Sequence, residues 1–281
     1  MGINLEHVEL LSELAREGKL RGGKVLELGL QDMFIPNEKL SKVLNTELSI
    51  LKPSDLFSFF GYEDHKSIDG QTKNPTCYPL DLNNIVDSKV VAELKSDLVT
   101  NFGTSEHVFN QMNVFRNIHE FCAKDGVMIH CVTTLGNVQH GYFNYQPRMF
   151  YELALANNYE ILAMYLTSDY RPILIPYSQR NLYKNRFKDV LFLVVFRKAS
   201  DASFVVPFDG MFGNQARVFG YSEGTSHTED FSKQFESFLV SGDWINLNNS
   251  RQEVFLKRTK SQLSRFGVRT RFKEFFNRKV E

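Results

Sequence analysis

The segment 97–111 constrains the fold of this chain more than any other part of the sequence. It runs from an apolar strand at 97–102, through a polar turn that contains Gly103, into an amphipathic helix expected at 108–123. In open α/β sheets, turns of this kind follow the carboxyl ends of parallel strands and supply the groups that contact ligands. Functional residues are therefore expected in the strand-to-helix turns.

The same pattern repeats through most of the chain. Apolar periodicity and turn signals predict a strand that ends at 67–69 and strands at 24–30, 76–82, 97–102, 127–132, 159–166 and 190–197. Helices are predicted at 5–17, 37–48, 54–60, 108–123 and 147–157. Pro79 restricts its segment to an edge or bulged strand. The pattern indicates an α/β fold with a doubly wound, seven-stranded, mostly parallel sheet, an antiparallel hairpin at its edge and an antiparallel last strand.

Several polar residues are expected to serve the fold itself. Asn37 and Ser54 are predicted N-caps of their helices. His130 lies in the middle of an apolar strand and is predicted to be a satisfied core residue. Three widely spaced cysteines fit buried, reduced thiols better than a disulfide or zinc framework. The helix at 108–123 is expected to turn one face inward, formed by Val108, Met112, Phe115, Ile118, His119 and Cys122.

Charge is distributed unevenly along a chain that has 33 Lys and Arg against 33 Asp and Glu. The segment 251–281 is strongly basic, so the preceding part is acidic. A solvated helical face packed on the acidic body is the favoured interpretation, with membrane binding as the alternative. Nucleic-acid binding is not expected, because the sequence has neither a recognition motif nor an aromatic stacking platform. A homodimer is an open option, with this tail as a candidate dimerisation element.

The chain carries no apolar run of about 20 residues and begins without a secretory signal pattern. We therefore expect a cytoplasmic protein with no transmembrane segment. The character of the sequence changes after Lys198, where an aromatic and glycine-containing loop at 203–227 precedes helices predicted at 229–240 and 250–277. The predicted organisation is a ligand-binding domain at 1–200 and a C-terminal helical extension at 201–281.

Glycine and acidic residues follow three successive strands. Gly29 lets backbone approach a ligand, although a glycine at a strand end is more often only a turn residue. Asp69 can accept two hydrogen bonds from a vicinal diol, or it can be a solvated turn residue beside Gly70. Asp81 can read an exocyclic amine together with Asn83, or it can cap a helix beginning near Asn84.

The order of these motifs resembles the class I S-adenosylmethionine-dependent methyltransferases, in particular bacterial members that modify surface sugars or small metabolites. The resemblance covers about residues 20–198. It rests on Glu27-Leu28-Gly29 after the first strand, Asp69 after the second, Asp81-Leu82-Asn83 after the third and the segment 101–107 after the fourth. It implies binding of S-adenosylmethionine by Glu27, Gly29, Gln31, Asp32, Asp69, Asp81, Leu82, Asn101, Gly103 and Glu106.

The first turn departs from the family pattern. Most members have a glycine-rich Glu/Asp-x-Gly-x-Gly-x-Gly turn, whereas residues 27–33 keep one of these glycines, Gly29. The side chains of Gln31 and Asp32 are then expected to contact the methionine part, since a carboxylate can bind an α-ammonium group directly.

Two histidines at strand ends are candidate catalytic groups. Methyl transfer from a sulfonium requires positioning and, for a hydroxyl acceptor, removal of a proton. His140 is the expected general base, because histidine titrates near neutral pH, and His107 is expected to assist. The alternative of a metal site formed by Glu106, His107 and His140 lacks a tight ligand spacing, so no metal is predicted. The predicted acceptor-binding residues are Gln139, Tyr142, Asn144, Tyr145, Phe208, Asp209 and Phe212.

The leading hypothesis is a methyltransferase, most simply an O-methyltransferase, acting on a small polar metabolite such as a sugar or nucleotide-sugar. A second hypothesis is a noncatalytic binding or scaffold subunit with the same fold, motivated by the eroded glycine turn. The third is an NAD-dependent oxidoreductase, against which the absence of Gly-x-Gly-x-x-Gly argues.

Overall fold

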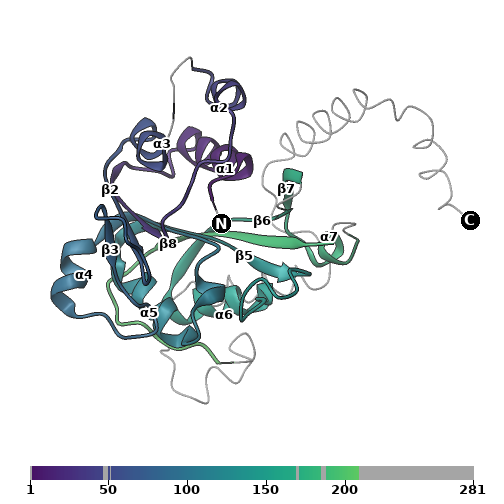
Figure 1. Ribbon diagram of the computed structural model, residues 1–281. Helices are drawn as coiled ribbons and strands as arrows, with labels where there is room; N and C mark the ends of the chain where they lie inside the picture. The colour runs from purple at the N-terminus through teal and green to yellow at the C-terminus, as the bar shows by residue number, and fades with distance from the viewer. Residues whose placement is uncertain (1, 47–49, 51, 169–170, 185–187, 209–281) are drawn as a thin grey trace, which may run out of the picture. The chain divides into compact units, whose positions relative to one another are not determined.

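The described part of the chain is built around one sheet (Figure 1). A computed structural model describes residues 2–46, 50, 52–168, 171–184 and 188–208. Their strands form an eight-stranded sheet in the order β3-β2-β1-β4-β5-β8-β6-β7. The strands are β1 (Gly23–Leu28), β2 (Tyr62–Asp69), β3 (Cys77–Pro79), β4 (Ser96–Phe102), β5 (Cys122–Leu135), β6 (Tyr159–Ser168), β7 (Arg171–Pro176) and β8 (Val190–Lys198).

The sheet is mostly parallel, as predicted, but the count of seven strands is wrong. β1 to β5 pair in parallel, whereas β8 is antiparallel to both β5 and β6. The prediction of an antiparallel last strand is confirmed. The predicted antiparallel edge is also confirmed, since β6 is antiparallel to β8, but the outermost strand is the additional strand β7, which pairs antiparallel with β6. β3, with Pro79, lies at the other edge, where a missing N–H is tolerated.

Helices cover both faces of the sheet. α1 (Leu5–Arg16), α2 (Asn37–Leu44) and α3 (Pro53–Phe59) lie on one face, and α4 (Ser88–Leu94), α5 (Gln111–Phe121) and α6 (Pro147–Asn157) lie on the other (Figure 1). A short 3-10 helix, η1 (Ser105–His107), follows β4, and α7 (Gln179–Lys184) precedes β8. This is the doubly wound arrangement that the sequence predicts.

Alternation along β5 separates two apolar layers. Val127, Ile129 and Cys131 belong to the core cluster that also contains Val8 and Leu11 of α1. The intervening His130 faces the other layer, where its ring contacts Phe115 and Phe150. Successive side chains of a strand point to opposite faces, so a strand covered on both sides is apolar throughout.

The predicted core histidines are confirmed. His130 is 1% exposed, its Nδ1 lies 3.2 Å from Nδ2 of Asn101, and burial lowers its pKa to about 3. His119 is equally buried, with Nδ1 2.6 Å from the Tyr159 hydroxyl and Nε2 2.9 Å from the Ala202 carbonyl. Burial lowers the pKa of His119 to about 4. The three cysteines are buried and free, also as expected.

Several local predictions need correction. Asn37 is the first residue of α2 rather than its N-cap, which is Pro36, and Lys52 rather than Ser54 caps α3. No helix begins near Asn84 in the described structure, since α4 begins at Ser88 after its capping residue Asp87. Met112 is 44% exposed, so it does not belong to the inward face of α5.

The chain beyond β8 is described as far as Phe208. Asn157 of α6 fixes this segment, since its Nδ2 donates to the Val205 carbonyl at 2.9 Å and its Oδ1 accepts from Val205 N at 2.7 Å. Most of the predicted 203–227 loop and the helices predicted at 229–240 and 250–277 fall outside the described residues. Within the described part, the helices are all too short or too polar to cross a membrane.

Candidate functional site

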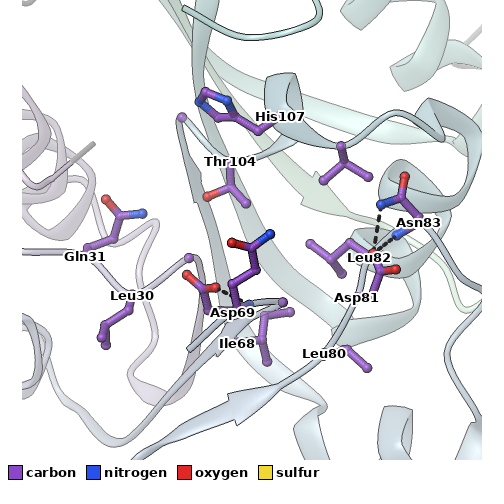
Figure 2. Close-up of a pocket in the computed structure, with 15 residues that line it drawn as sticks. Leu30, Gln31, Ile68, Asp69, Leu80, Asp81, Leu82, Asn83, Thr104 and His107 are labelled. Carbon is purple, nitrogen blue, oxygen red and sulfur yellow. Dashed lines mark hydrogen bonds between the residues drawn. The ribbon is translucent and has the colours of Figure 1, made fainter. Parts of the chain in front are cut away.

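A cavity of about 510 Å³ opens at the carboxyl ends of β1 to β4. Figure 2 shows Gln31, Asp69, Asp81 and Thr104 around this space. Its position is the one expected for ligand binding in an open α/β sheet. The cavity is lined by Gly29, Leu30, Gln31, Ile68, Asp69, Gly70, Gln71, Leu80, Asp81, Leu82, Asn83, Gly103, Thr104, His107 and Val108.

Gly29 is required where β1 turns into the cavity. Its φ of +79° lies in the left-handed region, and a Cβ atom built there would be 2.7 Å from Oγ1 of Thr104. Thr104 in turn donates from Oγ1 to the Leu28 carbonyl at 2.6 Å. The ends of β1 and β4 therefore approach too closely for a side chain at residue 29.

Gln31 follows this turn with its amide over the end of β1. Its Nε2 donates to the Leu28 carbonyl at 3.1 Å, and Gln31 is 5% exposed. Its Oε1 is buried without a hydrogen-bond partner among the described residues. Such an acceptor costs about 1–3 kcal/mol when left unpaired. Rotation of the amide toward a donor in the cavity would remove that cost.

Two predicted cofactor residues of the first turn do not line the cavity. Asp32 is exposed, and its carbonyl accepts from Ile3 N at 2.7 Å. Glu27 is fully buried, and its Oε2 lies 2.7 Å from Nε2 of His65 on β2. Burial raises the pKa of Glu27, while the contact with His65 opposes that rise. Glu27 therefore joins β1 to β2 beneath the cavity.

The acidic residues after β2 and β3 both line the cavity and both support local turns. Oδ1 of Asp69 accepts from Gln71 N at 2.8 Å. Oδ1 of Asp81 accepts from Asn83 N at 2.9 Å and from Asn83 Nδ2 at 2.8 Å (Figure 2). Oδ2 of Asp81 accepts from Asn84 Nδ2 at 3.1 Å. The described bonds of Asp69 involve one carboxylate oxygen, whereas those of Asp81 involve both.

The turn after β4 is organised by Asn101, which lies below the cavity lining. Asn101 is 1% exposed, and its Nδ2 donates to Ser105 Oγ at 2.8 Å while its Oδ1 accepts from Ser105 N at 3.0 Å. Gly103 lines the cavity, and its N–H donates to the Cys131 carbonyl at 2.9 Å. Asn101 therefore positions the turn rather than lining the cavity.

The turn after β4 meets the loop after β5 at a polar cluster. The ligand atoms of Glu106, His107 and His140 all lie within 4.8 Å of one another. Glu106 is wholly buried, whereas both histidines are exposed. His107 also lines the cavity, so the cluster adjoins it. His140 does not line the cavity, so of the two predicted histidines only His107 lies on its wall.

The predicted acceptor residues are dispersed. Tyr142 is 69% exposed and Gln139 is exposed with a φ of +64°. Asn144 donates from Nδ2 to the Gly136 carbonyl at 3.0 Å, which closes the loop. Tyr145 is only 4% exposed, and its hydroxyl donates to Gln111 Oε1 at 2.7 Å, so it serves the core. Phe208 is partly buried, and Asp209 and Phe212 lie outside the described residues.

Other residues emerge from the structure. Thr104 packs against Gly29, and Phe109 is 74% exposed beside Tyr142, with ring centroids 5.9 Å apart. The ring of Phe143 lies near both, with centroids 6.3 Å from that of Phe109 and 6.5 Å from that of Tyr142. An apolar residue just after a polar strand-end turn is the sequence signal that could have indicated Phe109.

The strand order, the antiparallel last strand and the cavity at the carboxyl ends define an α/β protein with a doubly wound, Rossmann-like sheet. No protein-family model matches the sequence, and no curated protein matches it.

Three of the solved structures to which the chain is similar are described here, and all three are methyltransferases. The chain is similar to the N-methyltransferase NodS from Bradyrhizobium japonicum WM9 at 12% identity and a TM-score of 0.39, over 69% of this chain and 96% of that chain. It is also similar to an O-methyltransferase from a trans-AT PKS multienzyme of Brevibacillus brevis, in complex with S-adenosyl-L-homocysteine. That match has 12% identity and a TM-score of 0.42, over 70% of this chain and 73% of that chain. The match to an S-adenosylmethionine-dependent methyltransferase from Clostridium acetobutylicum ATCC 824 has 11% identity and a TM-score of 0.35, over 70% of this chain and 93% of that chain. Values this low give no basis for assigning an activity or site residues.

Proposed function

We propose that this chain is an S-adenosylmethionine-dependent methyltransferase that acts on a hydroxyl, or less readily an amine, of a small polar acceptor such as a sugar or nucleotide-sugar. The observation that carries the proposal is the cavity in which Gly29, Asp69 and Asp81 meet from three neighbouring strand ends. These three positions combine close backbone approach with two carboxylates, as a nucleoside attached to an amino acid requires.

The lining residues fit the three parts of that cofactor. Asp69 has a carboxylate oxygen beyond the one that accepts from Gln71 N, and it would accept hydrogen bonds from the ribose hydroxyls. Leu82 and Val108 supply apolar surface for the purine. Oε1 of Gln31 would accept from the α-ammonium group, which would pair a buried oxygen. When bound, the cofactor supplies a methyl group on a sulfonium.

Proton removal is assigned to His140, and His107 assists at the border of the cavity. Nε2 of His140 lies 4.0 Å from Oε1 of Glu106, whose negative charge would stabilise the imidazolium formed when His140 takes the acceptor proton. Phe109, Tyr142 and Phe143 lie close by in sequence and form contacting rings. Their exposed faces suit the apolar face of a sugar ring.

The decisive experiment is calorimetric titration with S-adenosylhomocysteine, with NAD as a parallel control. Binding of S-adenosylhomocysteine alone supports the proposal and justifies a screen of sugar and nucleotide-sugar acceptors. Binding of NAD alone would replace the proposal by an oxidoreductase. Heat from neither ligand, with protein shown to be folded by circular dichroism, would favour a noncatalytic subunit.

The noncatalytic alternative has one specific structural motivation. The first turn carries a single glycine of the family pattern, and the Gln31 amide folds back to within 3.0 Å of the Cβ position of Gly29. This side chain occupies space beside the turn that a glycine-rich segment would leave open. A Gln31→Gly variant that binds S-adenosylhomocysteine when the parent chain does not would identify this side chain as the obstacle.

A further inference from the structure

Three side chains with metal-binding atoms meet beside the cavity. The carboxylate of Glu106 and the imidazoles of His107 and His140 lie within 4.8 Å of one another, measured between their ligand atoms. The two imidazole rings have centroids 5.0 Å apart. Within the described residues, this is the one group of three His, Cys, Asp or Glu side chains with such short mutual distances.

Backbone contacts hold the two contributing segments together. Tyr142 N and Phe143 N both donate to the Glu106 carbonyl, at 2.8 Å and 3.3 Å. A Cβ atom at Gly141 would lie 2.9 Å from the same carbonyl oxygen, so this approach depends on a glycine. The separation of Glu106 and His140 is therefore set by the fold rather than by two free side chains.

The cluster combines a buried carboxylate with two exposed imidazoles, so an ion could reach it from solvent. The Glu106 carboxylate is 0% exposed, whereas the His140 side chain is 32% exposed. A buried carboxylate is costly unless positive charge or hydrogen-bond donors compensate it.

We propose that Glu106, His107 and His140 bind a divalent first-row transition-metal cation such as Zn²⁺ or Mn²⁺. Two imidazole nitrogens and one carboxylate oxygen form a donor set that these ions accept. Adjacent ligands of a tetrahedral zinc ion are about 3.3 Å apart, so the exposed imidazoles must rotate inward. Three protein ligands leave an open coordination position, as in catalytic zinc sites.

The role of the cation, unlike its binding, rests on the proposed methyltransferase function. The open position would hold the acceptor hydroxyl, because a bound cation lowers the pKa of such a group. With the cation bound, the acceptor proton would pass to solvent and His140 would serve as a ligand, so this role is an alternative to the general-base role proposed for His140 above. Treatment with a chelator distinguishes the two roles of His140. Methyl transfer that needs the cation would stop, whereas methyl transfer with His140 as a general base would continue.

The test uses untagged full-length protein, stripped with a chelator and titrated with Co²⁺ while visible absorption is recorded. One equivalent of Co²⁺ is expected to bind and to give ligand-field bands, and Zn²⁺ is expected to displace it. His107→Ala, His140→Ala and Glu106→Gln should each lose the bands. His65→Gln, which alters the contact of His65 with Glu27 elsewhere among the described residues, should keep them.

Bands that persist unchanged in all three cluster variants, or a folded parent chain that binds no Co²⁺, would overturn the site. Because His107 and His140 are exposed, their alanine variants are expected to remain folded, which circular dichroism checks. Titration with S-adenosylhomocysteine tests the proposed function separately. Cofactor binding without Co²⁺ binding refutes the metal site alone, and Co²⁺ binding without cofactor binding supports the metal site while the methyltransferase proposal fails.

Discussion

Glu106 and His140 lie 4.0 Å apart between Oε1 and Nε2, although they belong to turns that follow different strands. β4 and β5 pair in parallel, with Asn101 opposite His130 and Phe102 opposite Cys131, so their following turns leave the same edge of the sheet. This relationship places a buried carboxyl group beside the partly exposed imidazole of His140.

Replacing His140 tests the assignment of the reacting group. His140→Ala is expected to reduce methyl transfer by roughly 10²–10⁴-fold, the usual contribution of a general base. Its affinity for S-adenosylhomocysteine should be unchanged, because His140 does not line the cavity. Turnover and calorimetry measure the two quantities, and unchanged turnover would contradict the assignment.

Asp69 is expected to contribute directly to cofactor affinity. Asp69→Ala should weaken S-adenosylhomocysteine binding by about tenfold or more, since hydrogen bonds to a charged group contribute about 1.5–3 kcal/mol. Asp64→Ala is a matched control on the same strand, where Asp64 Oδ2 is 3.8 Å from Lys24 Nζ at the surface. Equal affinities for the two variants in calorimetry would rule out the proposed contact.

A comparison of alanine substitutions at Gly29 and Gly18 separates two causes of lost stability, which are strain in left-handed backbone and a clash of the new Cβ atom with neighbouring atoms. Both have positive φ, +79° and +67°, but a Cβ at Gly18 meets nothing within 4 Å. Gly18→Ala is expected to lower the free energy of unfolding by about 1–2 kcal/mol, the cost of left-handed backbone for a residue with a side chain. Gly29→Ala should cost more, because Thr104 must also move. Urea denaturation compares them, and equal losses would mean that the contact with Thr104 is relieved freely.

Buried histidines predict destabilisation in mild acid. Burial lowers the pKa of His7 and His130 to about 3 and that of His119 to about 4, from 6.5. Between these values and pH 6.5 the unfolded chain binds more protons, so their contribution to stability is complete above 6.5 and is lost as the pH falls. The slope reaches about 1.4 kcal/mol per pH unit for each histidine.

The raised pKa of Glu27 acts in the opposite sense above pH 4.5, because its protonated form is favoured in the folded chain. His130→Gln tests the histidine contribution, since it removes one titrating group but keeps an acceptor for Asn101. Denaturation measured across the window should show a shallower dependence on pH in this variant. An identical dependence would show that His130 does not titrate in the unfolding equilibrium.

The sequence predicted the sheet because its signals are local. The continuous apolar run of β5 and the glycine at the end of β1 reflect burial on both faces and a tight turn. β7 escaped prediction because its sequence, Arg-Pro-Ile-Leu-Ile-Pro, carries two prolines that only an edge strand accommodates. The insertion of β8 between β5 and β6 depends on long-range pairing and has no local signal.

The candidate site was predictable by position but less so by role. Turns after β1 to β4 do line one cavity, yet Asn101 and Tyr145 turn their polar groups toward other protein atoms. A polar residue at a strand end looks the same in sequence whether it contacts a ligand or fixes a turn. Only the partner distinguishes these roles, and the partners of Asn101 and Tyr145 come from Ser105 and Gln111.

The hydrogen bonds from Tyr142 and Phe143 to the Glu106 carbonyl have a consequence for engineering. The turn at 103–107 and the loop at 136–146 form one module, because these two hydrogen bonds join them and Gly141 lies directly against the Glu106 carbonyl. Exchange of either segment alone with that of another protein would misalign both histidines. Chimeras that transfer the two segments together, with their glycine, are the ones that should inherit a donor protein's preference for its acceptor.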